Sequence, residues 1–206
     1  MSEGDFFSDE AKRATRASVQ SAEAQTSAEI VVAVRKSSGR YSVLAYHFGL
    51  GLALLVVTYL LLAPAVYSVE TIALDGMLAF ALGSLVVANL HTLQRALSRG
   101  LTLDANVNSG ARAAFFDLGI SRTQARNGLL VYVSMFERRC VVLTDIGIDL
   151  AQLGPRWADS QRDLADGVKR RDLRAFQRAV AELGKVFGAA HPRSAEDVNE
   201  LPDEVQ

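Results

Sequence analysis

The sequence predicts an α/β protein into which two membrane-spanning helices are inserted as a hairpin. Two long apolar runs lie in the first half of the chain, one β-branched run precedes them, and two further β-branched runs joined by a short turn follow them. Apolar runs of that length are typical of membrane spans. The shorter β-branched runs are typical of buried strands. We therefore expect soluble elements on both sides of a membrane hairpin.

Composition excludes several classes of protein. The 206 residues contain 22 basic and 23 acidic side chains, for a formal net charge of −1. A chain so nearly neutral lacks the basic field that holds nucleic acid, so we expect no nucleic-acid partner. Cys140 is the only cysteine, which excludes a disulfide within the chain and a cysteine-rich zinc site. The polar, acidic N-terminal segment lacks the features of a cleavable signal peptide.

The predicted spans are residues 43–69 and residues 72–93. The first contains no formally charged residue, and the second contains only Asp75, near its start. Each exceeds the roughly 20 residues that cross a hydrocarbon core of about 30 Å. The alternative is a pair of buried helices in a soluble domain. Such helices normally keep a polar stripe, whereas residues 51–62 carry only Thr58 and Tyr59 as polar-tipped side chains.

Basic residues flank the hairpin on its outer sides. Arg35, Lys36 and Arg40 precede the first run, and Arg95 and Arg99 follow the second, whereas the connection carries acids and no Lys or Arg. By the positive-inside rule, the soluble domain and both termini are cytoplasmic.

The soluble elements alternate between helix and strand. The spacing and capping residues predict a helix from Ser8 to about Gln25, a strand at 29–35, a helix from Asp104 to Gly119, strands at 129–136 and 140–145, and helices at 155–169 and from Asp172 onward. The helical crossover favours parallel pairing of the first two strands, and the turn at 137–139 favours an antiparallel hairpin. Residues 1–40 and 100–193 then form one discontinuous domain, residues 43–93 the hairpin, and residues 194–206 an acidic tail.

Parallel pairing has a consequence for the basic residues. The first strand feeds a membrane span within a few residues, so its carboxyl end faces the bilayer, and the turn that ends the second strand points the same way. We therefore predict a basic ring against anionic headgroups, formed by Arg35, Lys36, Arg40, Arg95, Arg99, Arg138 and Arg139. The alternative is that Arg138 and Arg139 form only a solvated turn.

The opposite end of the predicted sheet collects oxygen-bearing side chains. Antiparallel pairing brings Asn127 near Asp145 and Asp149, and Glu29 begins the neighbouring strand. These four residues are candidate ligands for Ca²⁺ or Mg²⁺. The alternative is that Arg126 forms an ion pair with Asp149, which makes the cluster plain surface structure.

Residues 111–148 resemble the TPM domain. They run ARAAFFDLGISRTQARNGLLVYVSMFERRCVVLTDIGI: a helix ending in Phe, an Ile-containing loop, an Asn-Gly turn, an apolar strand, a basic turn, and a strand closing on a Gly-containing acidic loop. The closing SAEDVNELPDEV, residues 194–205, and the inserted spans are similar to the bacterial membrane branch of that family. The resemblance covers residues 5–205.

The resemblance implies a three-layer α/β/α sandwich with a small mixed sheet, located at the bacterial inner membrane. Relatives include plant thylakoid proteins assigned acid phosphatase activity or a part in photosystem repair, receptor modulators, and proteins that bind divalent metal at acidic positions. This chain departs from the family pattern at Arg126, where many relatives have Asp. The substitution removes a potential metal ligand and adds a positive charge.

Two functions remain open from the sequence. The first is a non-enzymatic membrane-anchored domain that assists the assembly or maintenance of other membrane proteins, with the lipid bilayer and those proteins as partners. The second is a divalent-metal-dependent phosphatase acting through Asp145 and Asp149, with Asn127 and Glu29 as secondary candidates. The chain contains no GxSxG, GxxxxGK[ST], HExxH, CxxC or GxGxxG motif, so no standard nucleophilic or hydride chemistry is indicated.

Overall fold

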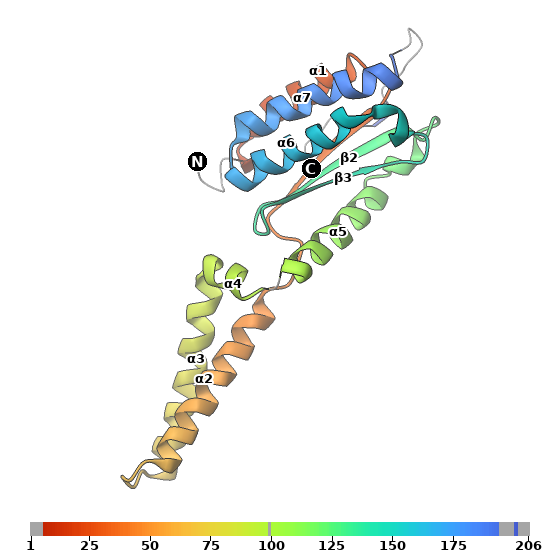
Figure 1. The fold of residues 1–206 in the computed structure, drawn as a ribbon. Helices are drawn as coiled ribbons and strands as arrows, with labels where there is room; N and C mark the ends of the chain where they lie inside the picture. The colour runs from red at the N-terminus through yellow and green to blue at the C-terminus, as the bar shows by residue number, and fades with distance from the viewer. Residues whose placement is uncertain (1–5, 99, 194–199, 202–206) are drawn as a thin grey trace. The chain divides into compact units, whose positions relative to one another are not determined.

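The computed structural model describes residues 6–98, 100–193, 200 and 201 (Figure 1). The chain divides into two compact units. The first unit comprises Met1–Ser38 and Asp104–Gln206, and the second comprises Gly39–Leu103.

The first unit is built on a mixed three-stranded sheet in the order β1-β2-β3. Its strands are β1 (Glu29–Arg35), β2 (Gly128–Ser134) and β3 (Arg139–Thr144). β1 and β2 are parallel, with Glu29 opposite Gly128 and Arg35 opposite Ser134. β2 and β3 are antiparallel, with Leu129 opposite Thr144. The α/β character and both strand pairings predicted from the sequence are present.

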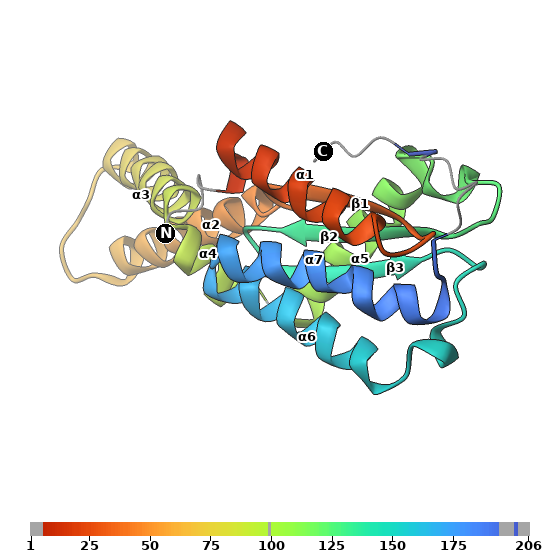
Figure 2. The same ribbon diagram turned by 90° about the horizontal axis from the view of Figure 1, so that it is seen from above.

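Alternate side chains of β1 enter different apolar clusters. Ile30, Val32 and Val34 belong to one cluster and Val31 and Ala33 to the other. Successive strand residues point to opposite faces, so both faces of the sheet are buried. The first cluster draws residues from α1 (Asp9–Glu23), α6 (Pro155–Arg170) and α7 (Leu173–Ala190), and the second draws them from α5 (Gly100–Asp117) and the short helix η2 (Ile120–Arg122) (Figure 2).

Helices α1 and α7 pack at unusually close range. A Cβ added at Gly184 would lie 2.5 Å from the Ala22 carbonyl oxygen, and one added at Gly188 would lie 2.4 Å from that of Gln25. The missing side chains let the two helices approach until backbone touches backbone. The same region joins α7 to the start of β1, because the Ser27 N–H donates to the His191 carbonyl oxygen at 3.0 Å.

Several predicted boundaries differ from the structure, and two of them lie beside the turn at residues 135–138 and at the start of α5. β2 ends at Ser134 rather than at residue 136, because residues 135–138 form the turn and Arg138 adopts a left-handed φ of 53°. α5 begins at Gly100, so Asp104 lies inside the helix and does not start it. The carboxylate of Asp104 instead accepts a hydrogen bond from the Arg139 Nε at 2.7 Å.

The second unit is a helical hairpin of α2 (Ser42–Leu62) and α3 (Val69–Asn89), followed by the short α4 (His91–Leu97). Both long helices are apolar and long enough to cross a membrane. Their contact is made by small residues. A Cβ added at Gly83 would lie 3.1 Å from the Gly49 Cα, so the helices approach closely along this face.

The ends of the two long helices follow local chemistry. α2 ends at Leu62, before the predicted end at residue 69, because Ala63 precedes Pro64 and adopts an extended ψ of 146°. A residue before proline is pushed out of the helical region. α3 starts at Val69, before the predicted residue 72, because the Ser68 hydroxyl oxygen accepts a hydrogen bond from the Thr71 N–H at 3.3 Å.

We expect Gly184→Ala to destabilise the first unit by about 1–3 kcal/mol, because the new methyl group would overlap the α1 backbone. Urea unfolding of the detergent-solubilised protein measures the change. The fluorescence of Trp157, the only tryptophan, is the reporter, since its ring packs edge-on against Phe187 at 5.4 Å. Lys185→Ala, which removes only an exposed ion pair to Glu182, is the control. An unchanged midpoint for Gly184→Ala would contradict the packing described.

Candidate functional site

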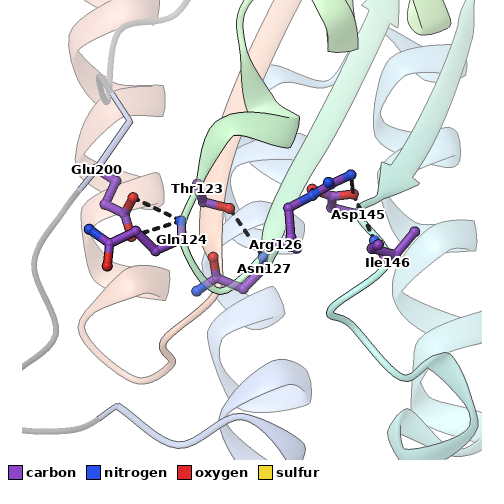
Figure 3. Close-up of polar contacts among 7 residues, drawn as sticks. All are labelled: Thr123, Gln124, Arg126, Asn127, Asp145, Ile146 and Glu200. Carbon is purple, nitrogen blue, oxygen red and sulfur yellow. Dashed lines mark hydrogen bonds and ion pairs between the residues drawn. The ribbon is translucent and has the colours of Figure 1, made fainter.

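Oxygen-bearing side chains gather where β2 begins and β3 ends, which we call the acidic end of the sheet (Figure 3). Asp145 is 4% exposed and is the most enclosed carboxylate there. Its Oδ2 accepts a hydrogen bond from the Arg126 Nε at 2.6 Å, and its Oδ1 accepts from the Arg126 Nη2 at 2.9 Å. The Ile146 N–H also donates to Oδ1, at 2.8 Å. The carboxylate is therefore held by three donors.

The electrostatics of Asp145 follow from these contacts. The hydrogen bonds from Arg126 lower the pKa of the Asp145 carboxyl below its ordinary value, against the opposing effect of burial. The same hydrogen bonds raise the pKa of Arg126. Arg126 reaches this geometry from a left-handed backbone with φ 54°, and its carbonyl oxygen accepts from the Gly147 N–H at 2.8 Å.

The predicted pair of Arg126 with Asp149 is therefore replaced by a pair with Asp145. The register places Leu129 opposite Thr144, so Asp145 is the first carboxylate beyond the ladder. Asp149 lies farther along and caps η3 (Leu150–Leu153), where its Oδ1 accepts from the Ala151 N–H at 3.0 Å. The chain turns between the two carboxylates, which the sequence pattern did not reveal.

The other two predicted ligands, Asn127 and Glu29, have hydrogen-bond partners of their own. The Asn127 side-chain amide donates to the Ser27 carbonyl oxygen, and its backbone N–H donates to the Thr123 Oγ1 at 3.2 Å. Glu29 is 5% exposed, and its Oε2 accepts from the Leu201 N–H at 3.4 Å. The neighbouring Glu200 carboxylate accepts from the Gln124 N–H at 3.0 Å. Residues of the C-terminal segment thus contact the acidic end.

These placements limit the chemistry of the acidic end. Among the described residues, no group of three or more His, Cys, Asp or Glu side chains lies close enough to share a metal ion. Asp145 is engaged by Arg126, and Asp149 by its own helix cap. A cation here would compete with the guanidinium of Arg126 for the same carboxylate.

The opposite end of the sheet, where β1 and β2 end, we call the exit end, because the chain leaves the first unit there at Ser38. It brings together four of the seven predicted basic-ring residues: Arg35, Lys36, Arg138 and Arg139. The Met135 and Phe136 N–H groups donate to the carbonyl oxygens of Arg35 and Lys36, at 3.0 and 2.9 Å. Of the remaining three, Arg40 and Arg95 belong to the second unit, and Arg99 lies outside the described residues.

A buried polar network at the exit end was missed in the sequence. Glu137 is 1% exposed, and its Oε1 accepts from the Ser38 N–H at 2.8 Å. The Ser38 hydroxyl donates to the Ser134 Oγ at 2.8 Å and lies 3.0 Å from the Tyr132 hydroxyl. The signal available was Tyr132 and Ser134, two polar side chains at alternate positions of an apolar strand. The network fixes the chain where it leaves the sheet.

An apolar groove of about 340 Å³ lies between α5 and β3. It is lined by Arg112, Phe115, Phe116, Ser121, Leu143 and Thr144. Phe116 is 72% exposed, and Ile146, just beyond Thr144, is 82% exposed. Large apolar side chains exposed to water around such a groove are typical of interaction surfaces.

Comparison with known proteins places the fold. No family model and no curated protein matches the chain. The NMR structure of the BA42 protein from the psychrophilic bacterium Bizionia argentinensis is similar, with a TM-score of 0.57 and 16% sequence identity. The similarity covers 96% of this chain and 92% of BA42. At this identity the likeness concerns the fold alone.

We expect Arg126→Gln to lower the free energy of unfolding by about 1–3 kcal/mol at neutral pH, because it leaves the buried Asp145 carboxylate without its cation. Since Arg126 depresses the pKa of Asp145, the stability it contributes is present above the unfolded pKa of about 4 and is lost as pH falls through the folded pKa. The deficit of the variant should therefore be largest near pH 7 and shrink in acid.

Urea unfolding between pH 3 and 7 measures this deficit. Arg139→Gln is the matched control, because the Arg139–Asp104 pair is half exposed at both ends and should contribute less than about 1 kcal/mol. A deficit for Arg126→Gln that stays constant across this pH range would show that Asp145 is not the group responsible.

Proposed function

We propose that this protein is anchored in the bacterial inner membrane by α2 and α3, and that its α/β unit is a cytoplasmic TPM-like domain. In this proposal, the domain binds other membrane proteins and assists their assembly or maintenance, without catalysis of its own. The finer fold proposed for it is the three-layer α/β/α sandwich of that family, with the hairpin inserted after the first strand.

The observation that carries the anchor is the apolar exterior of the hairpin. Among the residues of α2 only Ala45 and Gly49 are buried, and among those of α3 only Gly76, Ala79, Gly83 and Val87 are. Most of the exposed side chains on both helices are apolar, and Leu62, for example, is 81% exposed. A core helix of a soluble domain would be mostly buried. Lipid is the solvent that such a surface requires.

Charge supports the proposed orientation. The connection between α2 and α3 spans residues 63–68 and contains no Lys or Arg, and Glu70 lies in the first turn of α3. Basic residues lie at the other ends of the two helices, including Arg40 before α2 and Arg95 after α3. The positive-inside rule then favours a cytoplasmic α/β unit.

Two features favour binding over catalysis. The apolar groove offers exposed Phe116 together with Arg112, and the exposed Ile146 follows Thr144 of the groove lining by two residues. An apolar segment of a membrane protein that carries a carboxylate complements this surface. The acidic end, in contrast, has its enclosed carboxylate paired with Arg126. No contact among the described residues favours the metal-dependent phosphatase.

Cysteine labelling tests the topology. We expect Ser68→Cys to react with an impermeant maleimide from outside intact cells, because Ser68 lies in the connection between the spans. Ala189→Cys, on the exposed surface of α7, should react only after the cells are opened. The native Cys140 serves as a nearly silent background, since burial raises the pKa of its thiol to about 12. Outside labelling of Ala189→Cys in intact cells would refute the orientation.

Purification from native membranes tests the binding role. We expect wild-type protein, extracted in mild detergent, to carry a stoichiometric membrane-protein partner, and Phe116→Ser/Ile146→Ser to lose most of it, because the variant removes the exposed apolar contacts. The matched control is Val66→Ser, which changes an apolar residue outside the groove, in the connection between α2 and α3. Equal loss in the control, or no partner with wild type, would count against the binding role.

A further inference from the structure

Exposed basic side chains concentrate at one end of helices α1, α6 and α7. They are Lys12, Arg13 and Arg16 in the first half of α1, Lys169 and Arg170 at the end of α6, and Arg174 and Arg178 in the first half of α7. Three separate segments of the sequence supply them, and the sequence pattern did not group them.

These residues lie toward the exit end of the sheet. The last turn of α7 contacts the start of β1, where the Thr26 hydroxyl donates to the His191 carbonyl oxygen at 2.8 Å. The first turn of α7 therefore lies toward the end of β1 (Figure 2). α1 runs beside α7 in the same direction, since the Gln177 Nε2 donates to the Thr15 Oγ1 and Gly184 contacts Ala22. The basic residues thus share an end with Lys36 and Ser38.

A groove of about 390 Å³ lies within this basic region, and we call it the α1–α7 groove. Ser18, Arg174, Gln177, Arg178 and Ala181 line it. Neither Arg174 nor Arg178 has an ion pair or hydrogen bond to any residue that the structure describes. The lining contains no carboxylate, so an anion inside this groove would meet two arginines and no acid of the lining.

The neighbouring groove between α6 and α7 differs in charge. Its lining includes Asp163, Asp166, Asp172 and Glu182. Three of these acids are already engaged: Asp166 pairs with Arg170 at 3.2 Å, Glu182 pairs with Lys185 at 2.6 Å, and Asp172 caps α7 through the Ala175 N–H at 3.0 Å. Arg178 lines both grooves, whereas Arg174 lines only the α1–α7 groove, whose own lining holds no acid. An anion is therefore better placed in the α1–α7 groove.

The chain connection restricts where this end can lie. Ser38 is the last residue of the first unit, and α2 starts at Ser42. Four residues span at most about 14 Å. With α2 in a bilayer, as proposed above, the exit end stays within reach of the headgroup layer.

We propose that the α1–α7 groove binds the phosphate of anionic lipid headgroups and docks the domain onto the membrane that holds its hairpin. This rests on the proposed membrane insertion. A guanidinium presents paired donors that match phosphate oxygens. Lys12, Arg13 and Arg16 add attraction to the same negative surface. The soluble unit then makes two attachments to the bilayer, one covalent and one electrostatic.

The test compares full-length protein in nanodiscs of phosphatidylcholine alone with nanodiscs that also contain phosphatidylglycerol. An environment-sensitive fluorophore on Ala17→Cys, in a Cys140→Ala background, reports headgroup contact through quenching by spin-labelled lipids. We expect stronger quenching with the anionic lipid, and we expect it to weaken as salt shortens the Debye length from about 10 Å at 0.1 M to about 3 Å at 1 M.

Charge reversal identifies the groove. Each arginine near an anionic surface should shift the ratio of docked to undocked protein about fivefold, so Arg174→Glu/Arg178→Glu should lower it by at least about 25-fold. Arg122→Glu/Arg156→Glu makes the same charge change toward the acidic end and should leave docking nearly unchanged. Equal loss in both variants, or equal quenching in neutral and anionic discs, would overturn the proposal.

Inorganic phosphate separates the lipid from a soluble ligand. If phosphate at constant ionic strength protects the fluorophore from quenching in neutral discs while anionic lipid has no effect on the quenching, the groove binds a soluble phosphate and the lipid assignment is wrong.

Alkaline extraction separates this proposal from the proposed membrane anchor. Loss of docking in a protein that resists extraction overturns the headgroup site alone, whereas release at alkaline pH overturns the membrane insertion on which it rests.

Discussion

The arrangement of the first unit depends on the parallel pairing of β1 with β2. Parallel strands cannot be joined by a tight turn, so the chain between them has to cross back over the sheet. That crossover contains α5 and also provides the place in the sequence where α2 and α3 are inserted. Because both strands end together, the departure of the chain at Ser38 and the turn after Ser134 lie at the same exit end. Glu137 then bonds to both residues and holds that end together.

The two ends of the sheet use charge in different ways. At the acidic end, Asp145 is enclosed and satisfied by Arg126 and Ile146, so its charge stabilises the fold. At the exit end, the carboxylate of Glu137 is buried, whereas Lys36 and the arginines of the α1–α7 groove remain on the surface. A charge that is already paired inside the protein has little attraction left for a ligand, and an unpaired surface charge retains it. The proposed membrane contact therefore belongs to the exit end.

Much of the fold was predictable because the signals are local. The β-branched runs, the Ser8 and Asp172 caps and the Asn-Gly step at the start of β2 each act on neighbouring residues, and the predicted helices, strands and strand pairings followed from them. The ends of the strands were less predictable where the backbone conformation of one residue decided them, as at Arg138 in the turn between β2 and β3. The candidate site was less predictable still. Asp145, Asp149, Asn127 and Glu29 lie in the expected part of the sheet, but each side chain has a separate partner.

The sequence by itself determined the two apolar helices, the order of strands and helices around them, and the uneven charge on their flanks, because length, periodicity and composition are properties of contiguous residues. Only the tertiary structure decided that Arg126 pairs with Asp145 instead of Asp149, that Glu137 is buried against Ser38, and that Arg174 and Arg178 share a groove with Ser18. Those contacts join residues from 19 to 160 positions apart in the sequence, and their selection depends on strand register and on the close approach of α1 to α7 at Gly184.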